Sequence, residues 1–508
     1  MNRIFKLTLN EFLRNIKKVS TFVIIILTAL VIFGFGAIVQ NATNNRAQFR
    51  LDNAIAGTNP DNQSAMSQQL TYLQNQISQA VSDADKAIAQ SQYDILNAAY
   101  QKGIYVAIAS IPTSVQFSDP VTYQEVAVLN AINSKVASLS SKSTDLDTIS
   151  GQYLDSALNS NFNEFITADN ASFVYNSGLP ESDPTNQAYI YANSLRLQYD
   201  VTNLDAPGSG TKNDLVSDIY NNKVGLIQGI NPATSAVLTD TDIANANDNI
   251  PIDTYKLDHN IVASENIDVT IAALNSQIPP NLVGLGISIV SILMAILAGS
   301  TIAQEIATGA IKSLIIAPVK RWKIFLSKFL AITVLAILLD LLVYLVSAVT
   351  SLVFYGNSLE SYFKVIGGQV AVIQPLLYIF YLTLLRIPEL IIFIILAMML
   401  STLTRNTAIS ISIVVAFGLI GNTVVTVLAN FFKGEWLKFM PFQHFSDLAS
   451  KIFPTPAFTF GSRALRVMVN NTTPSIPVTS LTFSIVYLIV VFVLMYYTAH
   501  ESFVKKDI

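Results

Sequence analysis

Long apolar runs constrain this chain more than any other feature, because a run of about 20 apolar residues is long enough to cross a bilayer as an α-helix. Hydrophobic residues make up 51% of the 508 residues and charged residues only 13%, which is typical of a membrane protein. The sequence therefore predicts an α-helical polytopic membrane protein with six transmembrane helices, the first of them at 19–41. The six runs begin near Val19, Leu282, Phe325, Leu376, Ala408 and Leu481.

Charged residues divide the chain into two unlike parts. Residues 42–280 hold 10 Lys and Arg against 25 Asp and Glu, whereas the remainder holds 20 basic and 9 acidic residues. We therefore expect 42–280 to be an extracytoplasmic domain between the first and second spans, and 281–508 to be a five-helix membrane domain. Cytoplasmic segments carry excess Lys and Arg, so the basic N-terminus and the basic end of the chain (Lys505, Lys506) predict that both termini are cytoplasmic. The chain has no cysteine, so this domain folds without disulfides.

The residue pattern of the insert, residues 42–280, predicts a mixed α/β domain. One helix with a weak coiled-coil seam is expected from residue 70 to residue 87, and a second from residue 129 to residue 139, because apolar residues recur there at spacings of three and four. The alternating stretch 103–117 predicts a strand. The seams consist of Leu70, Leu73, Ile77, Ala80, Ala84 and Ala87, and of Leu129, Ile132, Val136 and Leu139.

Residues 1–18 are expected to begin the chain with an amphipathic cytoplasmic helix. Phe5, Leu9, Phe12 and Ile16 share one face, and basic residues lie opposite. Such a helix lies in the headgroup region of a membrane. It is either an anchor that orients the first span or a functional element.

The chemistry of an enzyme is missing from the sequence. There is no Gly-rich phosphate loop followed by Lys-Ser/Thr, so we do not expect this chain to bind ATP in the usual way. The three histidines (His259, His444, His500) are scattered, and without cysteine they do not predict a zinc site. We expect no catalysis, no cofactor and no nucleic-acid partner for the chain by itself.

Three ionisable residues interrupt the predicted spans. Asp340 lies in the middle of one span, where an ionisable group is costly and faces protein or water. Arg386 and Glu389 are three residues apart, so on a helix they can pair on one face. These residues form either a substrate path or gate, or a polar lock between helices or subunits.

The segment 304–325, QEIATGAIKSLIIAPVKRWKIF, is too polar to cross a bilayer and is predicted to lie on the cytoplasmic side. We expect a short helix near residues 309–316, ending before Pro318, because proline disfavours helical geometry in the residue before it. The apolar side of that helix would carry Ile311, Leu314 and Ile315. It is either an interfacial connector or a docking surface for a cytoplasmic partner.

The pattern in this segment, E-x-x-x-G-x-x-x-x-L-x-x-x-P-x-x-R with a lysine seven residues later, resembles the coupling segment of type-2 ABC transporter permeases. Two other stretches resemble the same family: LAMMLSTLTRNTAIS (396–410) its second cytoplasmic loop, and FMPFQHFSDLASKIF (439–453) its outer segment that dips back toward the membrane. We therefore expect an outer re-entrant segment at 431–479. The coupling residues by resemblance are Glu305, Gly309, Leu314, Pro318, Arg321 and Lys328.

This resemblance implies six spans, a second permease subunit that is identical or homologous, and a separate dimeric ABC ATPase in the cytoplasm that binds ATP and magnesium. It places the chain in the bacterial plasma membrane. The expected function is the permease subunit of an exporter of antimicrobial peptides, drugs or an envelope component. The large insert after the first span departs from the family pattern and keeps two alternatives open. One is a surface protein of the phage-infection-receptor type or a secretion accessory, and the other is an ATPase-driven mechanical transmitter without transport.

Overall fold

A computed structural model gives the architecture of the chain. The residues that the structure describes are 2–57, 62–106, 122–204, 212–232, 235–238, 240–262, 269–308, 320–356, 361–418, 435–441, 444, 448, 452–453 and 479–505.

Five helices within these residues are long and apolar enough to cross a membrane. The run interrupted by Arg386, Pro388 and Glu389 is one continuous helix, α14. The sixth predicted span begins in a shorter apolar helix, Thr407–Gly418, and its continuation at 419–434 lies outside the described residues. The five helices are α2 (Val19–Gly57), α11 (Val269–Ala307), α13 (Arg321–Tyr355), α14 (Pro375–Thr404) and α18 (Leu481–Lys505).

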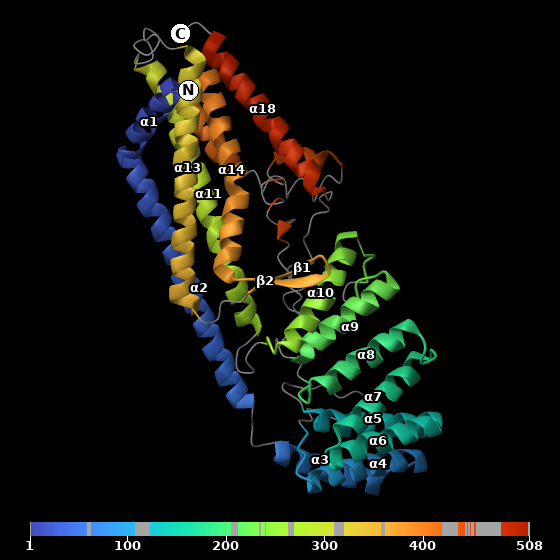
Figure 1. Cartoon of the computed structure of the whole chain (residues 1–508). Coiled ribbons are helices and arrows are strands. Elements are labelled where there is room, and N and C mark those ends of the chain that lie inside the picture. The colour runs from blue at the N-terminus through green and yellow to red at the C-terminus, as the bar shows by residue number, and fades with distance from the viewer. Residues whose placement is uncertain are drawn as a thin grey trace.

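The long helices run side by side, and the two ends of the chain lie at the same end of them, opposite the insert (Figure 1). The amphipathic helix α1 (Asn2–Ile16) lies at this end and packs against α13. Phe12 and Ile16 contact the core of the bundle, whereas Phe5 and Leu9 are exposed. Only part of the predicted apolar face of α1 is therefore covered by protein.

A glycine allows α2, α11 and α13 to approach closely. A Cβ added to Gly286 of α11 would lie 2.6 Å from Val343 Cγ1 of α13 and 2.7 Å from Ile32 Cδ1 of α2. Real Cβ atoms do not approach carbon this closely, so a larger residue here forces the helices apart. Helix contacts of this kind, made over small residues, are typical of membrane helices.

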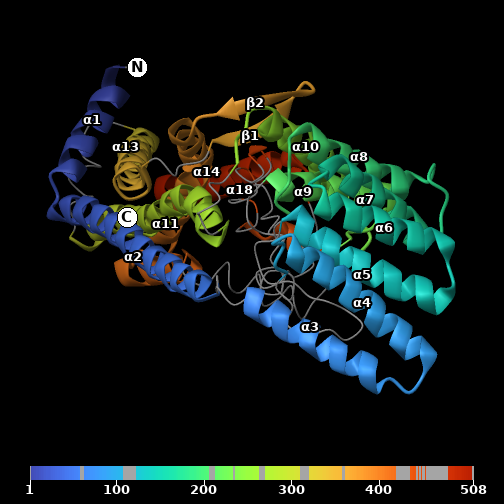
Figure 2. The ribbon, with the colours of Figure 1, turned by 90° about the horizontal axis from the view of Figure 1, so that it is seen from below.

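The described part of the insert is a stack of helices in which each helix packs against the next along the chain (Figure 2). Two apolar cores hold it together, one formed mainly by α3 to α7 and one by α8 to α10. The helices are α3 (Asn62–Gln79), α4 (Asp83–Gln101), α5 (Tyr123–Ser141), α6 (Thr144–Leu158), α7 (Phe162–Ser177), α8 (Pro184–Gln198), α9 (Lys212–Gln228) and α10 (Asp240–Asp258).

This helical stack differs from the mixed α/β domain that the sequence predicts. Among the described residues of the insert, β structure is confined to two isolated bridges, Thr122–Asn203 and Ile230–Val237. The predicted strand at 103–117 falls largely on 107–121, outside the described residues. The strand therefore stays a prediction.

The prediction of a single helix from residue 70 to residue 87 is wrong, and that of a helix from 129 to 139 is confirmed by α5. The first pattern crosses a break between α3 and α4. Ser82 caps α4 there, because its Oγ accepts a hydrogen bond from the backbone N–H of Asp85 at 3.0 Å. The cap starts a new helix in the middle of the apolar pattern.

A β-hairpin joins α13 to α14 at the end of the bundle nearest the insert (Figure 1). Strands β1 (Tyr362–Ile366) and β2 (Gln369–Ile373) are antiparallel, with Ile366 opposite Gln369. Gly367 and Gly368 form the turn with φ of +60° and +80°, the left-handed geometry that glycine adopts without strain. The ring of Phe363 in β1 lies 6.2 Å from that of Tyr255 in α10, so the hairpin contacts the insert.

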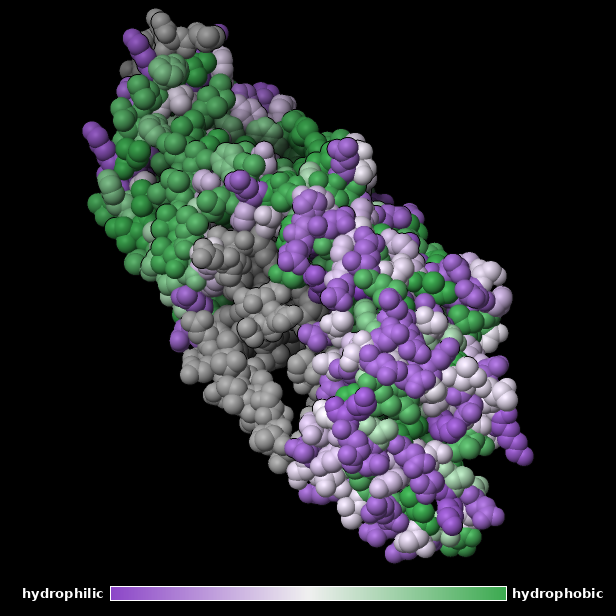
Figure 3. Space-filling view, turned by 60° about the horizontal axis from the view of Figure 1, so that its bottom comes forward, coloured by the Kyte–Doolittle hydropathy of each residue, from purple (hydrophilic) through white to green (hydrophobic). Residues whose placement is uncertain are grey.

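The surface reflects the two parts of the chain (Figure 3). Apolar side chains cover the long helices, and polar side chains predominate over the insert. A bilayer hides the first kind of surface from water, and water solvates the second.

Candidate functional site

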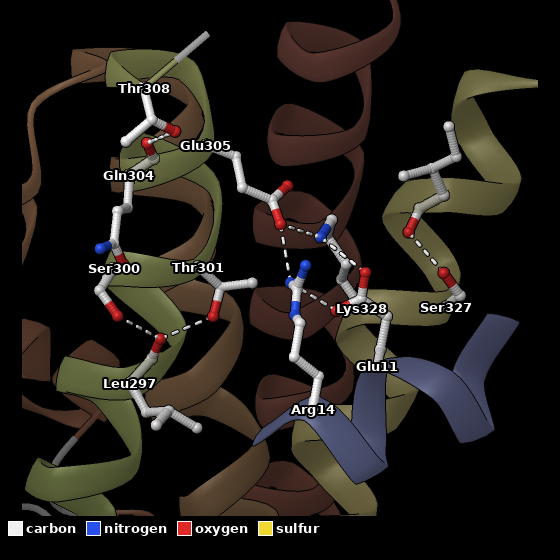
Figure 4. A network of polar contacts seen from close by, with 11 residues as sticks. Glu11, Arg14, Leu297, Ser300, Thr301, Gln304, Glu305, Thr308, Ser327 and Lys328 are labelled. Carbon is white, nitrogen blue, oxygen red and sulfur yellow. Dashed lines mark hydrogen bonds and ion pairs between the residues drawn. The ribbon is translucent and has the colours of Figure 1, made fainter. Parts of the chain in front are cut away.

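Four charged side chains from three helices meet where α1 crosses the ends of α11 and α13 (Figure 4). Glu305 lies in the last turn of α11, and Lys328 lies two turns into α13. Glu11 and Arg14 are three residues apart on α1, so they project from the same side of that short helix. The three helices thus bring together residues that are about 300 positions apart.

The four groups form a closed ring of alternating charge. Lys328 Nζ donates to Glu305 Oε1 at 2.7 Å and to Glu11 Oε1 at 2.9 Å. Arg14 Nη2 lies 2.7 Å from Glu305 Oε1 and 2.6 Å from Glu11 Oε2. Each acid contacts both bases, and the ring as a whole is neutral.

Burying these charges costs free energy, because the charged groups lose their hydration. The side chain of Lys328 is 1% exposed and that of Glu305 is 10% exposed, whereas Arg14 reaches solvent at the edge of the ring. A buried ammonium group requires opposite charges and hydrogen bonds to offset its lost hydration. Burial, followed by the positive charge of Arg14, also lowers the pKa of the neighbouring Lys18.

The same side of α1 carries further polar residues. Thr8, Glu11 and Asn15 follow the spacing of one helical face, and the side-chain oxygens of Thr8 and Asn15 are buried. The opposite face exposes Phe5, Leu9 and other apolar residues. Helix α1 is therefore held to the protein both by this side and by Phe12 and Ile16, and it leaves Phe5 and Leu9 exposed.

The ring brings the two ends of the predicted coupling segment, 304–325, together. Glu305 is the second residue of that segment and Lys328 lies three residues beyond its end, so their ion pair fixes where the chain leaves α11 and where it enters α13. Gly309, Leu314 and Pro318 lie outside the described residues, as does the predicted short helix at 309–316.

Arg321, at the start of α13, has a partner in the same protein. Its Nη1 donates to the backbone carbonyl of Val504 in the last turn of α18, at 3.3 Å. The contact ties the segment to the C-terminal helix. Its predicted role at an interface with an ATPase stays a prediction.

Sequence patterns pointed to Glu305 and Lys328 but missed Glu11 and Arg14. The signal available for them was an acid and a base at a spacing of three on the polar face of an amphipathic helix. Such a pair is common on solvated helices. Its role here comes from the contact with α11 and α13, which the sequence near residue 11 does not encode.

The three ionisable residues of the predicted spans, Asp340, Arg386 and Glu389, lie in α13 and α14. Arg386 Nη1 donates to Glu389 Oε2 at 3.0 Å, which confirms the predicted pair on one face of α14. Asp340 is 1% exposed and so faces protein. Arg386 also approaches α11, where its Nη2 lies 3.7 Å from the place that a Cβ on Gly284 would occupy.

The other two stretches of interest pack against the bundle where they are described. Ser401, within 396–410, donates to the carbonyl of Gly299 at 2.7 Å and accepts from the N–H of Ala303 at 2.9 Å, which ties α14 to α11. In the predicted outer segment, His444 is buried with Nδ1 3.0 Å from Ser484 Oγ of α18. Most of 431–479 lies outside the described residues.

These arrangements join helices to one another. The described residues contain no group of three His, Asp or Glu that could hold a metal ion. The ring of charges has no nucleophile and no open ligand position. Its chemistry is that of a clamp between three helices and the segment that they bracket.

Comparison with known proteins identifies a family that matches nearly the whole chain and a relative that matches about half of it. The family model described as "ABC-2 family transporter protein" matches residues 6–508. An uncharacterised protein of Bacillus subtilis (strain 168), YhcI, is 25% identical over 272 residues, which cover 51% of this chain and 75% of that protein.

Proposed function

Because the chain belongs to the ABC-2 family of transporter proteins, whose members are membrane permeases that work with an ABC ATPase, we propose that it is the permease subunit of an exporter. In this proposal a separate cytoplasmic ATPase dimer binds ATP and magnesium, and a second permease subunit, identical or homologous, completes the membrane unit. The exported substrate is an antimicrobial peptide, a drug or an envelope component.

The observation that carries the proposal is the ring formed by Glu11, Arg14, Glu305 and Lys328. A segment that receives force from an ATPase has to be joined rigidly to the helices that it moves, since a loose connection would dissipate the motion. The Lys328–Glu305 ion pair joins α13 to α11 at the base of segment 309–319, and Arg14 adds α1. Force applied to the segment would thus reach three helices together.

The proposed orientation follows from charge. The end of the bundle that carries α1, the ring and both termini is the cytoplasmic end, because its segments are rich in Lys and Arg. The acidic insert then lies outside the cell, on top of the hairpin that joins α13 to α14. An exporter with this arrangement would release its substrate beside the insert.

The test is a steric block in the coupling segment. Gly309→Trp adds bulk where we propose that the backbone approaches the ATPase, so it should abolish co-purification of the ATPase and ATP-dependent export. Arg321→Glu should weaken both, because it reverses a charge at the edge of the contact and removes the hydrogen bond to Val504. The matched control is Val372→Trp, an equally bulky change at an exposed position in the hairpin at the opposite end.

We expect all three variants to insert normally and only the control to keep full ATPase binding and full export. If Gly309→Trp and Arg321→Glu both retain the partner and full export, the segment is a connector only. A specific observation keeps the mechanical alternative open: the insert contacts the hairpin between α13 and α14, so motion of the bundle could be passed to the insert without transport. ATPase binding without export of any substrate would favour that alternative. Absence of an ATPase partner altogether would favour a receptor-like surface protein.

A further inference from the structure

A second group of charges lies deep in the bundle, away from the ring at its end. Asp340 is in the middle of α13, and Arg386 and Glu389 are in the middle of α14. These two acids and one base sit where a bilayer would surround the helices. Ionisable residues at that depth are rare and pair with one another or face water.

Asp340 differs from Arg386 and Glu389 because, among the described residues, its side chain has no hydrogen-bond partner. Its residue is 1% exposed, and among the described residues neither carboxylate oxygen accepts or donates a hydrogen bond. Arg386 is engaged with Glu389 at 3.0 Å. The guanidinium of Arg386 therefore pairs with Glu389 and not with the buried carboxyl group of Asp340.

The charges that act on Asp340 are few. Helices α1, α2, α11, α14 and α18 all pack against α13. Away from the ends of these described helices, the only other charged residues within the apolar spans are Arg386 and Glu389 of α14. Among the described spans, Arg386 is thus the one base at this depth that could neutralise it.

Asp340, Arg386 and Glu389 together lack one positive charge. With all three groups ionised, the cluster holds two carboxylates and one guanidinium, which is a net charge of −1. An unpaired carboxylate in a low-dielectric interior is strongly disfavoured, and the like charge of Glu389 adds to the cost. A neutral carboxyl group is far less costly to bury than a carboxylate.

We propose that Asp340 is a proton-binding site of the membrane domain, and that the two carboxyl groups share one guanidinium and one proton. In this structure the guanidinium of Arg386 is on Glu389, so the proton is on an oxygen of Asp340. If Arg386 moves to Asp340, that carboxyl group releases its proton to water and Glu389 takes one up. The total charge of the cluster stays the same in both arrangements.

The backbone beside Arg386 favours such an exchange. Pro388 lies inside α14, between Arg386 and Glu389. Proline has no N–H to donate to the carbonyl four residues earlier, that of Leu384, so the helix is weakened at this turn. The base that would change partners is therefore carried by the part of α14 that bends most easily. This proposal depends neither on the docking of an ATPase nor on the exported substrate.

Infrared spectroscopy of the full-length protein in lipid nanodiscs tests the proposal, because the carbonyl stretch of a protonated carboxylic acid is separate from the bands of carboxylates. The measurement is the spectrum of the wild type minus that of Asp340→Asn, recorded while the pH is raised from mildly acidic to alkaline. Asparagine has nearly the same shape as a protonated aspartate, so we expect this variant to fold. We expect one protonated-carboxyl band at neutral pH that is lost in a single step as the pH rises.

Two further variants test the sharing of charge. Glu389→Gln leaves Arg386 free to pair with Asp340, so the band of Asp340 should disappear although Asp340 is still present. Arg386→Gln removes the only base, so both carboxyl groups should be protonated and the band should double. A wild-type spectrum identical to that of Asp340→Asn in this region would overturn the proton site. A band that persists unchanged in Glu389→Gln would overturn the sharing of one proton and one guanidinium.

Discussion

Replacing Lys328 by methionine removes the buried centre of the ring at the end of the bundle. Methionine keeps most of the length and apolar volume of the lysine stem but carries no charge. Glu305 and Glu11 each lose a partner, at 2.7 Å and 2.9 Å from Nζ, and only Arg14 remains to neutralise two carboxylates. The cluster changes from neutral to a net charge of −1 in a place that is largely shielded from water.

The expected loss follows from the cost of leaving a buried charge unpaired. Breaking a buried ion pair by removing one partner costs about 3–5 kcal/mol, much of it the penalty on the charge left behind. Because Lys328 is 1% exposed and its partners only slightly more, we expect a loss in that range. Adding Glu305→Gln restores neutrality, with Arg14 and Glu11 still paired at 2.6 Å. The double variant should therefore recover about 2 kcal/mol or more relative to the sum of the single changes.

The assay is reversible unfolding of the purified protein in mixed micelles, followed by loss of helical circular dichroism, for the two single variants and the double variant. Lys320→Met is the control, since Lys320 is exposed at the start of α13. We expect that change to cost within about 0.5 kcal/mol. The reasoning is refuted if Lys328→Met costs no more than the control, or if the two single effects simply add.

Three further predictions follow from the packing and the insert. Gly286→Ala should destabilise the protein by about 1–3 kcal/mol, because its Cβ would lie 2.6 Å from Val343, whereas Gly34→Ala, with nothing within 4 Å, should be close to neutral; equal effects in thermal unfolding would contradict this. The excised segment 42–280 should unfold cooperatively and show helical circular dichroism, since it has two apolar cores of its own; a random-coil spectrum and rapid proteolysis would show otherwise. Burial raises the pKa of Asp253 in α10 to about 6, so the unfolded state ionises first and the free energy of unfolding of this segment should fall between about pH 4 and pH 6. That loss should level off at higher pH and be absent in Asp253→Asn, and an identical pH dependence in the two proteins would refute it.

Features fixed by local patterns were predictable from the sequence. Apolar length identified the long helices, a spacing of three placed Arg386 and Glu389 on one face of their helix, and amphipathic periodicity identified α1. In each case the interaction that stabilises the element lies within a few residues of chain or depends only on transfer into an apolar medium. Glu305 and Lys328 were predicted from a family pattern, and the sequence did not predict the ion pair between them.

Features fixed by distant contacts were not predictable in this way. The ring depends on Arg14 meeting Glu305 across nearly 300 residues, and no local signal records that meeting. The apolar seam from residue 70 to residue 87 continued at helical spacing through a helix break, since Ser82 acts on backbone N–H groups and does not alter the apolar period. The hairpin at 362–373 was not predicted, because its Gly367–Gly368 turn is a short signal between two long apolar runs.

The central claim is that segment 309–319, bracketed by the ion pair between Glu305 and Lys328, receives a cytoplasmic ATPase. The most direct measurement is photocrosslinking in the native membrane, with a photoreactive amino acid at Leu314 and, as a control, at Val372 in the hairpin at the other end of the bundle. Crosslinked partners are then identified by mass spectrometry. The account predicts that position 314 captures an ABC ATPase and that position 372 does not. Capture of no ATPase at 314, or equal capture at both positions, would contradict it.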